Sequence, residues 1–219
     1  MNSKHPSHNN EYLGVTANSP NFKLMVICDL DYTLVNLNTT NELLSIVNPR
    51  KFKILSRLLV PLSILGRIFK RDFTKQVLVK SILCGISKPH LERLSLLLYK
   101  RITGKINLDL LSIIRRIGYR GPSILLTASL DIIASKFREL GFNCVISSST
   151  FYAGEKFIGF CDLYRRKYEV IRDILLSNYS PRKVIIFDDS PEPEMWTLCD
   201  KRGKVRIFIV KTYKNVDEM

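Results

Sequence analysis

Two aspartates separated by one residue follow an apolar run near the start of the chain. The run KLMVIC at 23–28 has the composition of a buried strand, and Asp29 and Asp31 come directly after it. Two carboxylates that lose water side by side repel each other, unless a divalent cation or a shared proton offsets the charge. In such a pair one carboxylate can attack a phosphorus atom while the other carries a proton. The alternative is that both aspartates cap and solvate the loop after the strand.

Polar groups that could hold a phosphate follow a second apolar run. The sequence LLTAS places Thr127 and Ser129 at its end, where hydroxyls and the N–H groups of a following helix can bind phosphate. An ordinary turn or helix cap is the alternative for either residue. Lys167 begins a helical stretch and can reach a phosphoryl oxygen, although a lysine beside two arginines is also typical of surface charge.

A second acidic pair ends a third apolar run. The sequence FDDSPE contains Asp188 and Asp189, and carboxylate oxygens are hard ligands of the kind that Mg²⁺ takes while it keeps several waters. Adjacent acids also occur in simple turns. Glu192 and Glu194 are alternative ligands, or residues of the loop surface.

The elements that must position these residues alternate between strands and helices. Uniformly apolar runs indicate parallel strands that are covered on both faces. The segments between them have helical periodicity, so we expect an α/β fold with a doubly wound, Rossmann-like parallel sheet. The predicted strands are 23–28, 122–126, 183–187 and 205–210, and the predicted helical segments between them are 131–141, which ends at Gly141, and 164–178.

The interval 38–118 is predicted to be helical throughout. Thr39 and Thr40 are candidate N-caps, Asp72 and Pro89 mark later helix starts, and a helix ends at Gly118. We therefore predict an α/β core over 21–37 and 119–219, with a helical insert over 38–118 directly after the first strand. Such an insert would lie over the carboxyl end of the sheet, where folds of this class bind ligands.

The bulk composition adds few constraints. The chain has 219 residues and a net charge of +14, which favours anionic partners such as phosphate esters, acidic lipid surfaces or nucleic acid, or is a solvated surface only. The five cysteines contain no CxxC pair, which disfavours zinc ligation and a disulfide framework and is typical of a cytosolic protein. Residues 1–20 are polar, and we expect a flexible tail there rather than a signal peptide.

Taken in order, DLDYT, LLTAS, Lys167 and IIFDDS resemble the four motifs of the haloacid dehalogenase superfamily. The helical insert is similar to the C1 cap of that family, and TASLDIIASKFRELGF resembles the phosphoserine-phosphatase-like branch. The resemblance covers roughly residues 23–200 and implies a Mg²⁺-dependent phosphatase that hydrolyses a phosphate monoester through an aspartyl-phosphate intermediate. A phosphotransferase with the same intermediate is the alternative within enzymes.

The resemblance also implies a role for each residue. Asp29 would be the nucleophile and a metal ligand, and Asp31 would be the general acid and base, with its backbone carbonyl on the metal. Thr127, together with Ser129, would bind the phosphoryl group, and Lys167 would neutralise it. The metal site would be completed by Asp189, with Asp188 or an acid just beyond.

Three positions depart from the family pattern, and one of them is Pro193, where a further acid can follow the fourth motif. Tyr32 stands where the family usually has glycine, and it would narrow the pocket or supply a ring. Asp188 stands where the fourth motif usually has glycine, although an adjacent pair of aspartates resembles a known variant of that motif.

The apolar segment 51–71 bears on the substrate. It is flanked by basic residues and interrupted by Arg57, Pro61, Gly66 and Arg67, which disfavours a membrane span. One interpretation is a helix at a lipid interface, which would fit a lipid phosphate such as phosphatidylglycerophosphate and a cytoplasmic protein associated with membranes. The other is a pair of packed cap helices, which would fit a small monoester such as phosphoserine or a sugar phosphate.

A non-catalytic basic module that binds nucleic acid or acidic membranes is the competing class. Only the net charge favours it, because no basic patch interleaved with aromatic residues and no zinc-finger spacing appears. We therefore expect no nucleic-acid partner, and the sequence indicates no obligate protein partner.

Overall fold

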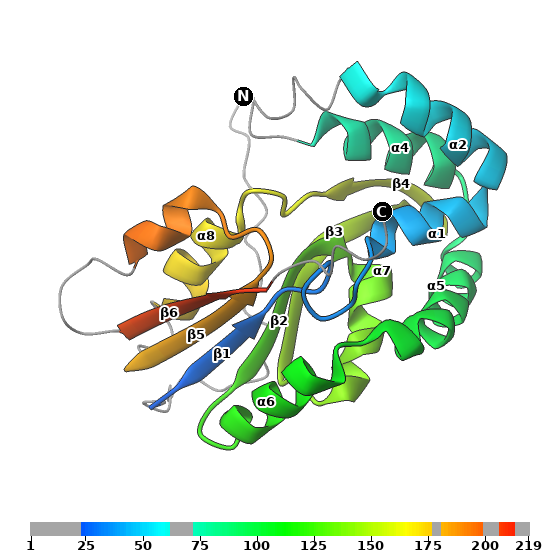
Figure 1. Cartoon of the computed structure of the whole chain (residues 1–219). Helices are drawn as coiled ribbons and strands as arrows, with labels where there is room; N and C mark the ends of the chain where they lie inside the picture. Colours follow the sequence, from blue (N-terminus) through cyan, green and yellow to red (C-terminus); the bar gives the residue numbers. More distant parts are fainter. Residues whose placement is uncertain (1–22, 62–71, 177–180, 199–205, 213–219) are drawn as a thin grey trace.

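The computed structural model describes residues 23–61, 72–176, 181–198 and 206–212, and a mixed sheet lies at its centre (Figure 1). Within these residues the sheet has six strands in the order β4-β3-β2-β1-β5-β6. All neighbours are parallel except β3 and β4, which pair as an antiparallel hairpin. The strands are β1 (Met25–Cys28), β2 (Ser123–Leu130), β3 (Cys144–Ala153), β4 (Lys156–Cys161), β5 (Lys183–Asp188) and β6 (Arg206–Lys211).

The four predicted strands are confirmed as β1, β2, β5 and β6, while the β3–β4 hairpin was not predicted. The sheet is therefore not parallel throughout, since β4 lies antiparallel at its edge. Serine and threonine occupy the middle of β3, so this strand lacks the uniformly apolar run that indicates a buried parallel strand. Gly154 turns the hairpin with a φ of 57°.

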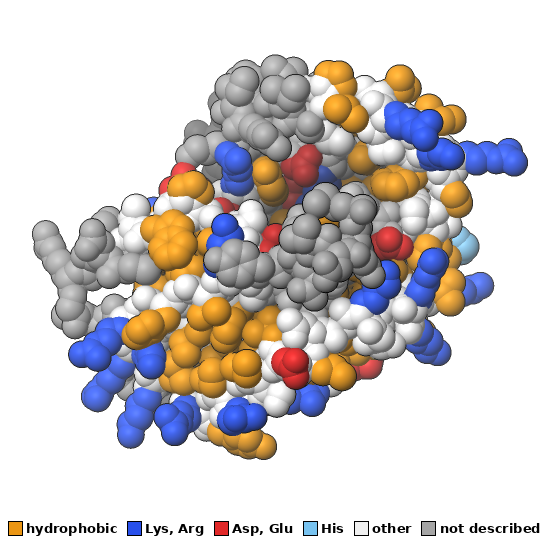
Figure 2. Space-filling view, in the orientation of Figure 1, with side chains coloured by type: hydrophobic (Ala, Val, Ile, Leu, Met, Phe, Trp, Pro, Cys, Tyr) orange, Lys and Arg blue, Asp and Glu red, His pale blue; other side chains and the backbone are white. Residues whose placement is uncertain are grey.

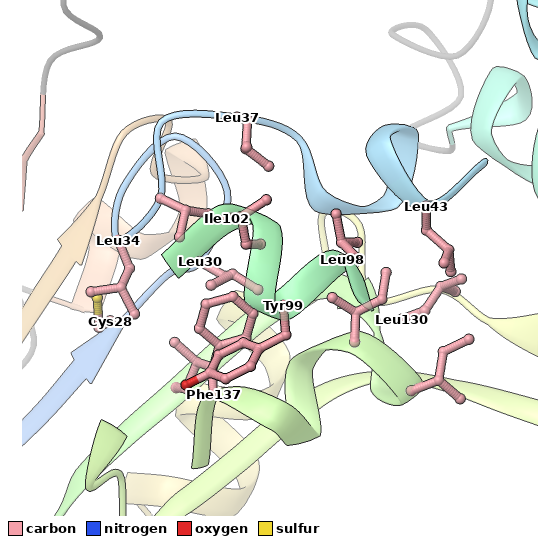
Figure 3. Packing of buried hydrophobic residues seen from close by; sticks show 14 of the residues in the cluster. Cys28, Leu30, Leu34, Leu37, Leu43, Leu98, Tyr99, Ile102, Leu130 and Phe137 are labelled. Atoms are coloured by element: carbon pink, nitrogen blue, oxygen red, sulfur yellow. The ribbon is translucent and has the colours of Figure 1, made fainter. Parts of the chain in front are cut away.

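Side chains of the central strands alternate between two hydrophobic clusters. Met25 and Ile27 of β1 belong to a cluster with Ile171 and Met195, from the segments after β4 and β5. Val26 and Cys28 belong to the other cluster, which contains the buried residues of the helical insert. Figure 3 shows part of this second cluster, where Tyr99 packs edge-on against Phe137 with ring centroids 5.2 Å apart. Both faces of the sheet are covered, which explains why its strands read as continuous apolar runs.

The predicted helical insert is confirmed as helical where the structure describes it. Its helices are α1 (Thr39–Val47), α2 (Pro49–Leu58), α4 (Phe73–Leu83), α5 (Lys88–Ile102) and α6 (Leu108–Gly118), with a short 3₁₀ turn η2 (Thr103–Lys105). Asp72 caps α4 by accepting from the N–H of Lys75. The prediction of Thr39 or Thr40 as N-cap was wrong, because Asn38 caps α1. The proposed boundaries of core and cap stay a prediction.

Shorter helices follow β2, β4 and β5. They are α7 (Asp131–Ala134), η3 (Ser135–Leu140), α8 (Lys167–Glu169), the π-helical η4 (Val170–Leu176) and η5 (Pro193–Leu198). Gly141 ends η3 in the left-handed conformation with a φ of 99°, as the sequence predicts for a residue that terminates a helix.

The segment 51–71 is described only as far as residue 61, and its remainder lies outside the described residues. Helix α2 has no buried residue, but Phe52, Leu55 and Leu59 pack partly against the second cluster. Ile54 and Leu58 are instead 59% and 69% exposed. Both interpretations of this segment therefore have support. No helix within the described ranges is long and apolar enough to cross a membrane.

Candidate active site

The residues singled out from the sequence meet at the carboxyl ends of β1, β2 and β5. Strand β1 lies between the other two, with Cys28 opposite Leu125 of β2 and Phe187 of β5. Asp29 follows β1 directly, and its N–H donates to the carbonyl of Phe187 at 2.9 Å. The next strands in the sequence, β2 and β3, lie on one side of β1, while β5 and β6 lie on its other side. This edge is therefore the switch point where doubly wound sheets bind ligands.

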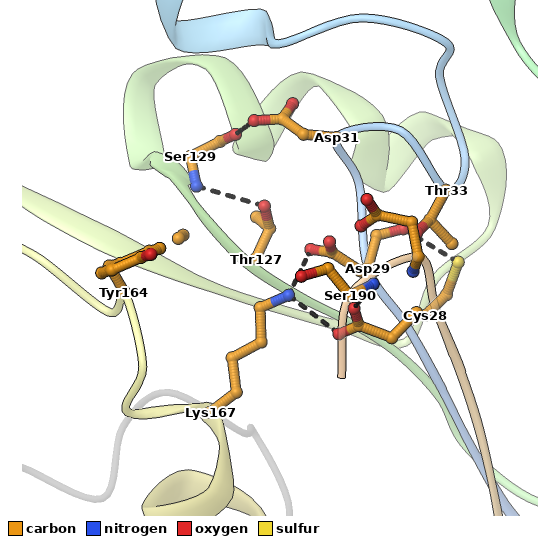
Figure 4. Close-up of polar contacts among 12 residues, drawn as sticks. Cys28, Asp29, Asp31, Thr33, Thr127, Ser129, Tyr164, Lys167 and Ser190 are labelled. Carbon is orange, nitrogen blue, oxygen red and sulfur yellow. Dashed lines mark hydrogen bonds and ion pairs between the residues drawn. The ribbon is translucent and has the colours of Figure 1, made fainter. Parts of the chain in front are cut away.

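A buried lysine lies between two of the carboxylates. The Nζ atom of Lys167, in α8, lies 2.8 Å from Oδ1 of Asp29 and 3.0 Å from Oδ2 of Asp188 (Figure 4). The three side chains are 12%, 8% and 3% exposed. Although burial opposes it, the two carboxylates raise the pKa of Lys167 above its usual value. Lys167 is therefore a fixed positive charge beside Asp29.

The acidic cluster carries more negative charge than Lys167 neutralises. Asp29, Asp188 and Asp189 each offer an oxygen, and these oxygens lie within 4.8 Å of one another. Burial, opposed by Lys167 and reinforced by Asp188, raises the pKa of Asp29 to about 7. Three carboxylates this close together make a donor set that suits a hard divalent cation. The residues present therefore fit the Mg²⁺ site that the sequence predicts.

The carboxylate of Asp31 is held apart from this cluster. Its Oδ1 accepts from the N–H of Thr39 at 3.0 Å, and its Oδ2 accepts from Oγ of Ser129 at 2.7 Å. Burial raises the pKa of Asp31, although these hydrogen bonds oppose the shift. Ser129 also donates its N–H to Oγ1 of Thr127 at 3.1 Å, as Figure 4 shows. Ser129 therefore orients Asp31 in this structure.

A cavity of about 350 Å³ contains the site. Six of the seven predicted residues line it, whereas Ser129 is buried and lies outside its lining. Figure 2 shows acidic side chains recessed in a hollow near the centre of this face, with lysine and arginine side chains spread around the periphery. The six that line the cavity are Asp29, Asp31, Thr127, Lys167, Asp188 and Asp189.

Two residues that support the site were not recognised from the sequence. Glu192, considered as a metal ligand or a surface residue, is buried, and its carboxylate accepts from the N–H groups of Lys167 at 3.1 Å and Tyr168 at 2.9 Å. Thr33 accepts from the N–H of Asp189 at 2.9 Å through its Oγ1. The one available signal for Glu192 was that it is an acid shortly after the two aspartates of FDDSPE.

Comparison by sequence identifies no relative: no family model matches the chain, and no curated protein matches it. Comparison by structure does. A Bordetella pertussis protein of unknown function matches with a TM-score of 0.61 and 14% identity, over 85% of this chain and 98% of that one. The phosphoserine phosphatase of T. onnurineus matches with a TM-score of 0.54 and 14% identity, over 87% and 90%.

A hydrolase of the haloacid dehalogenase family from Salmonella enterica serovar Typhi matches with a TM-score of 0.55 and 16% identity. That match covers 75% of this chain and 56% of the hydrolase. The resemblance to the haloacid dehalogenase superfamily is thus confirmed at the level of the fold, which is that of its phosphoserine-phosphatase-like members.

Proposed function

We propose that the protein is a Mg²⁺-dependent phosphatase that hydrolyses a phosphate monoester through an aspartyl-phosphate intermediate. The observation that carries this proposal is the contact of one buried lysine with both Asp29 and Asp188 at the carboxyl edge of the sheet. A cation in this position can neutralise a phosphoryl oxygen and orient the attacking carboxylate, and phosphoryl transfer depends chiefly on such alignment and neutralisation. The neighbours described as phosphatases support the same chemistry.

The first half of the reaction would use both aspartates of DLD. An oxygen of Asp29 attacks phosphorus and forms an O–P bond, while the bond from phosphorus to the ester oxygen breaks. Asp31 gives its proton to the departing oxygen, which leaves as an alcohol. In the second half, a water oxygen attacks the same phosphorus as Asp31 takes its proton, and Asp29 is released with inorganic phosphate. An alcohol in place of water would make the enzyme a phosphotransferase.

Asp29, Asp188 and Asp189 would hold the Mg²⁺ ion. When bound, the ion supplies positive charge that offsets the carboxylates and the phosphoryl oxygens. Thr127 lies on the cavity wall beside this cluster and would donate its hydroxyl to the phosphoryl group. Lys167 keeps its proton throughout, because its pKa lies well above neutrality.

Replacement of the nucleophile tests the mechanism. The Asp29→Asn variant is expected to lose at least about 10³-fold in kcat for release of phosphate from an aryl phosphate, with an unchanged circular dichroism spectrum. Wild-type protein in EDTA is expected to lose activity and to regain it when Mg²⁺ is added. Full activity in the variant or in EDTA would contradict the proposal. Salt-sensitive binding of nucleic acid without turnover would favour the competing binding module.

A lipid-borne phosphate monoester is a specific candidate substrate. The exposed side chains of Ile54 and Leu58 on α2 favour it, since they lie one helical turn apart among basic residues, as in helices that bind at membrane interfaces. A small monoester such as phosphoserine or a sugar phosphate is the alternative, and structural neighbours that include phosphoserine phosphatases favour that class.

A further inference from the structure

Two residues that line the cavity have an unusual backbone conformation. Among the described residues other than glycine, only Tyr32 and Arg165 have positive φ, at 59° and 56°, and both line the cavity. The left-handed region costs a residue with a side chain on the order of 1 kcal/mol. Such strain persists where the surrounding structure imposes it, and it clusters at functional sites. Both residues are therefore candidates for a role in binding substrate.

The two residues flank the catalytic groups in the sequence. Tyr32 directly follows Asp31, and its N–H donates to the carbonyl of Leu37 at 3.3 Å, so it is part of the tight loop after β1. Arg165 lies two residues before Lys167 in the turn between β4 and α8. Its guanidinium carbon lies 5.6 Å from the centre of the Tyr164 ring. Tyr164 also lines the cavity, and Figure 4 shows its ring on the side of Thr127 and Lys167.

The distribution of charge gives Arg165 a distinct role. The described lining of the cavity contains two cationic side chains, Lys167 and Arg165, and five carboxylates. Lys167 is buried between Asp29 and Asp188, where it would serve the phosphoryl group, whereas Arg165 is exposed. A negative group elsewhere on the substrate would be repelled by the acidic lining and attracted to Arg165, whose planar guanidinium matches carboxylates and phosphates.

We infer that Arg165, with the rings of Tyr32 and Tyr164, forms a subsite for the leaving group. It selects phosphate monoesters whose leaving group carries a second anionic group, with the tyrosine rings against the carbon atoms between the two charges. This inference rests on the proposed phosphatase activity. A carboxylate and a phosphodiester share the required chemistry, and they correspond to the small-molecule and lipid sources of substrate respectively.

Two matched aryl phosphates test the inference. One carries a carboxymethyl group on the ring and the other a carbamoylmethyl group, so the two probes differ in charge. Because a methylene separates each group from the ring, the two phenols are leaving groups of similar acidity. The meta and para isomers of both are assayed by phosphate release. The wild-type kcat/KM is expected to be about 10- to 100-fold higher for the carboxylate, the range for a hydrogen-bonded charge pair. The ratio is expected to fall to within about threefold of one in Arg165→Gln.

Arg166→Gln is the matched control. This neighbouring arginine is also exposed, and its Nε bonds Oε2 of Glu169 at 3.1 Å. It differs from Arg165 in not being part of the described cavity lining. The control variant loses the same charge and should keep the wild-type ratio. An equal fall in both variants would assign the preference to the general positive charge of the protein and overturn the subsite.

A second variant and a third probe complete the test. Tyr32→Gly is expected to raise KM severalfold for both probes, since it removes a wall that both would contact, and an unchanged KM would exclude Tyr32 from the subsite. A probe with a methyl phosphodiester in place of the carboxylate separates the two sources. A higher kcat/KM for the carboxylate probe would indicate a small-molecule substrate, and a higher kcat/KM for the phosphodiester probe would indicate a lipid. Equal turnover of charged and neutral probes by the wild type would overturn the inference, while no turnover of any probe would refute the phosphatase itself.

Discussion

Glu192 is the residue whose side chain connects the fourth motif to Lys167. Its carboxylate is buried and accepts both N–H groups at the start of α8, which have no partner within so short a helix. Because α8 begins at Lys167 itself, the position of the ammonium group depends on this cap. In the proposed phosphatase, Glu192 would therefore position Lys167 rather than ligate the metal.

Glu192→Ala should accordingly weaken both folding and activity. We expect the free energy of unfolding to fall by about 1–2 kcal/mol and kcat to fall on the order of 10-fold, since Lys167 loses its alignment with Asp29. Glu192→Gln keeps one of the two acceptor oxygens and should recover part of both losses. Urea unfolding and phosphate release measure them. Glu155→Ala, at an exposed position in the β3–β4 turn, is the control, and a similar effect there would contradict this role.

At the scale of elements, one ion pair connects the helical insert to the sheet. Lys75 of α4 lies 2.5 Å from Oδ1 of Asp162, just after β4, and its Nζ donates to the carbonyl of Ala128 at 2.6 Å. Both charged side chains are about nine-tenths buried. Ala128 lies between Thr127 and Ser129 near the end of β2, so this contact joins the insert to the part of the strand that orients Asp31.

Breaking this pair should destabilise the protein more than a surface pair would. Lys75→Met is expected to lower the free energy of unfolding by about 3 kcal/mol, because Asp162 is left buried without its cation. The double variant Lys75→Met/Asp162→Leu should recover much of that loss. Lys88→Met is the matched control, since its pair with Glu92 is about half exposed and is worth less than about 1 kcal/mol. If Lys75→Met and Lys88→Met lose the same free energy of unfolding in urea, the buried pair stabilises the protein no more than the exposed pair does.

At the scale of the whole molecule, we propose that the net charge of +14 and the exposed apolar residues of α2 would act together at a membrane surface. A basic protein is attracted to anionic lipid surfaces, and apolar side chains such as Ile54 and Leu58 can then enter the interface. If the charge alone were responsible, binding to vesicles would depend on exposed lysine and arginine residues in general and not on the apolar residues of α2.

Vesicle sedimentation separates the two contributions. We expect the protein to bind vesicles that contain phosphatidylglycerol, and Ile54→Ser/Leu58→Ser to bind several-fold more weakly at the same salt concentration. Ile113→Ser/Ile158→Ser, which removes two exposed isoleucines from α6 and β4, is the control. If both variants bind as the wild type does, α2 is not a membrane contact.

The sequence was most informative about features that depend on a single strand or helix and its ends. Strands β1, β2, β5 and β6 could be predicted because a strand covered on both faces needs apolar residues at every position. The site residues could be predicted because the carboxyl ends of parallel strands share one edge, so polar residues that follow those strands must meet there. The β3–β4 hairpin escaped prediction since β3 carries serine and threonine in its middle and both strands are partly exposed.

The sequence alone thus determined the α/β class, the helical insert and the residues gathered at the carboxyl edge, since each follows from the periodicity or the ends of single elements. The tertiary structure decided how those residues are held: Lys167 between Asp29 and Asp188, Ser129 on Asp31, Glu192 under α8. It also decided that Tyr32, which departs from the expected motif, and Arg165 line the same cavity. These contacts join residues far apart in the chain, and only the packing of the elements brings such side chains within hydrogen-bonding distance.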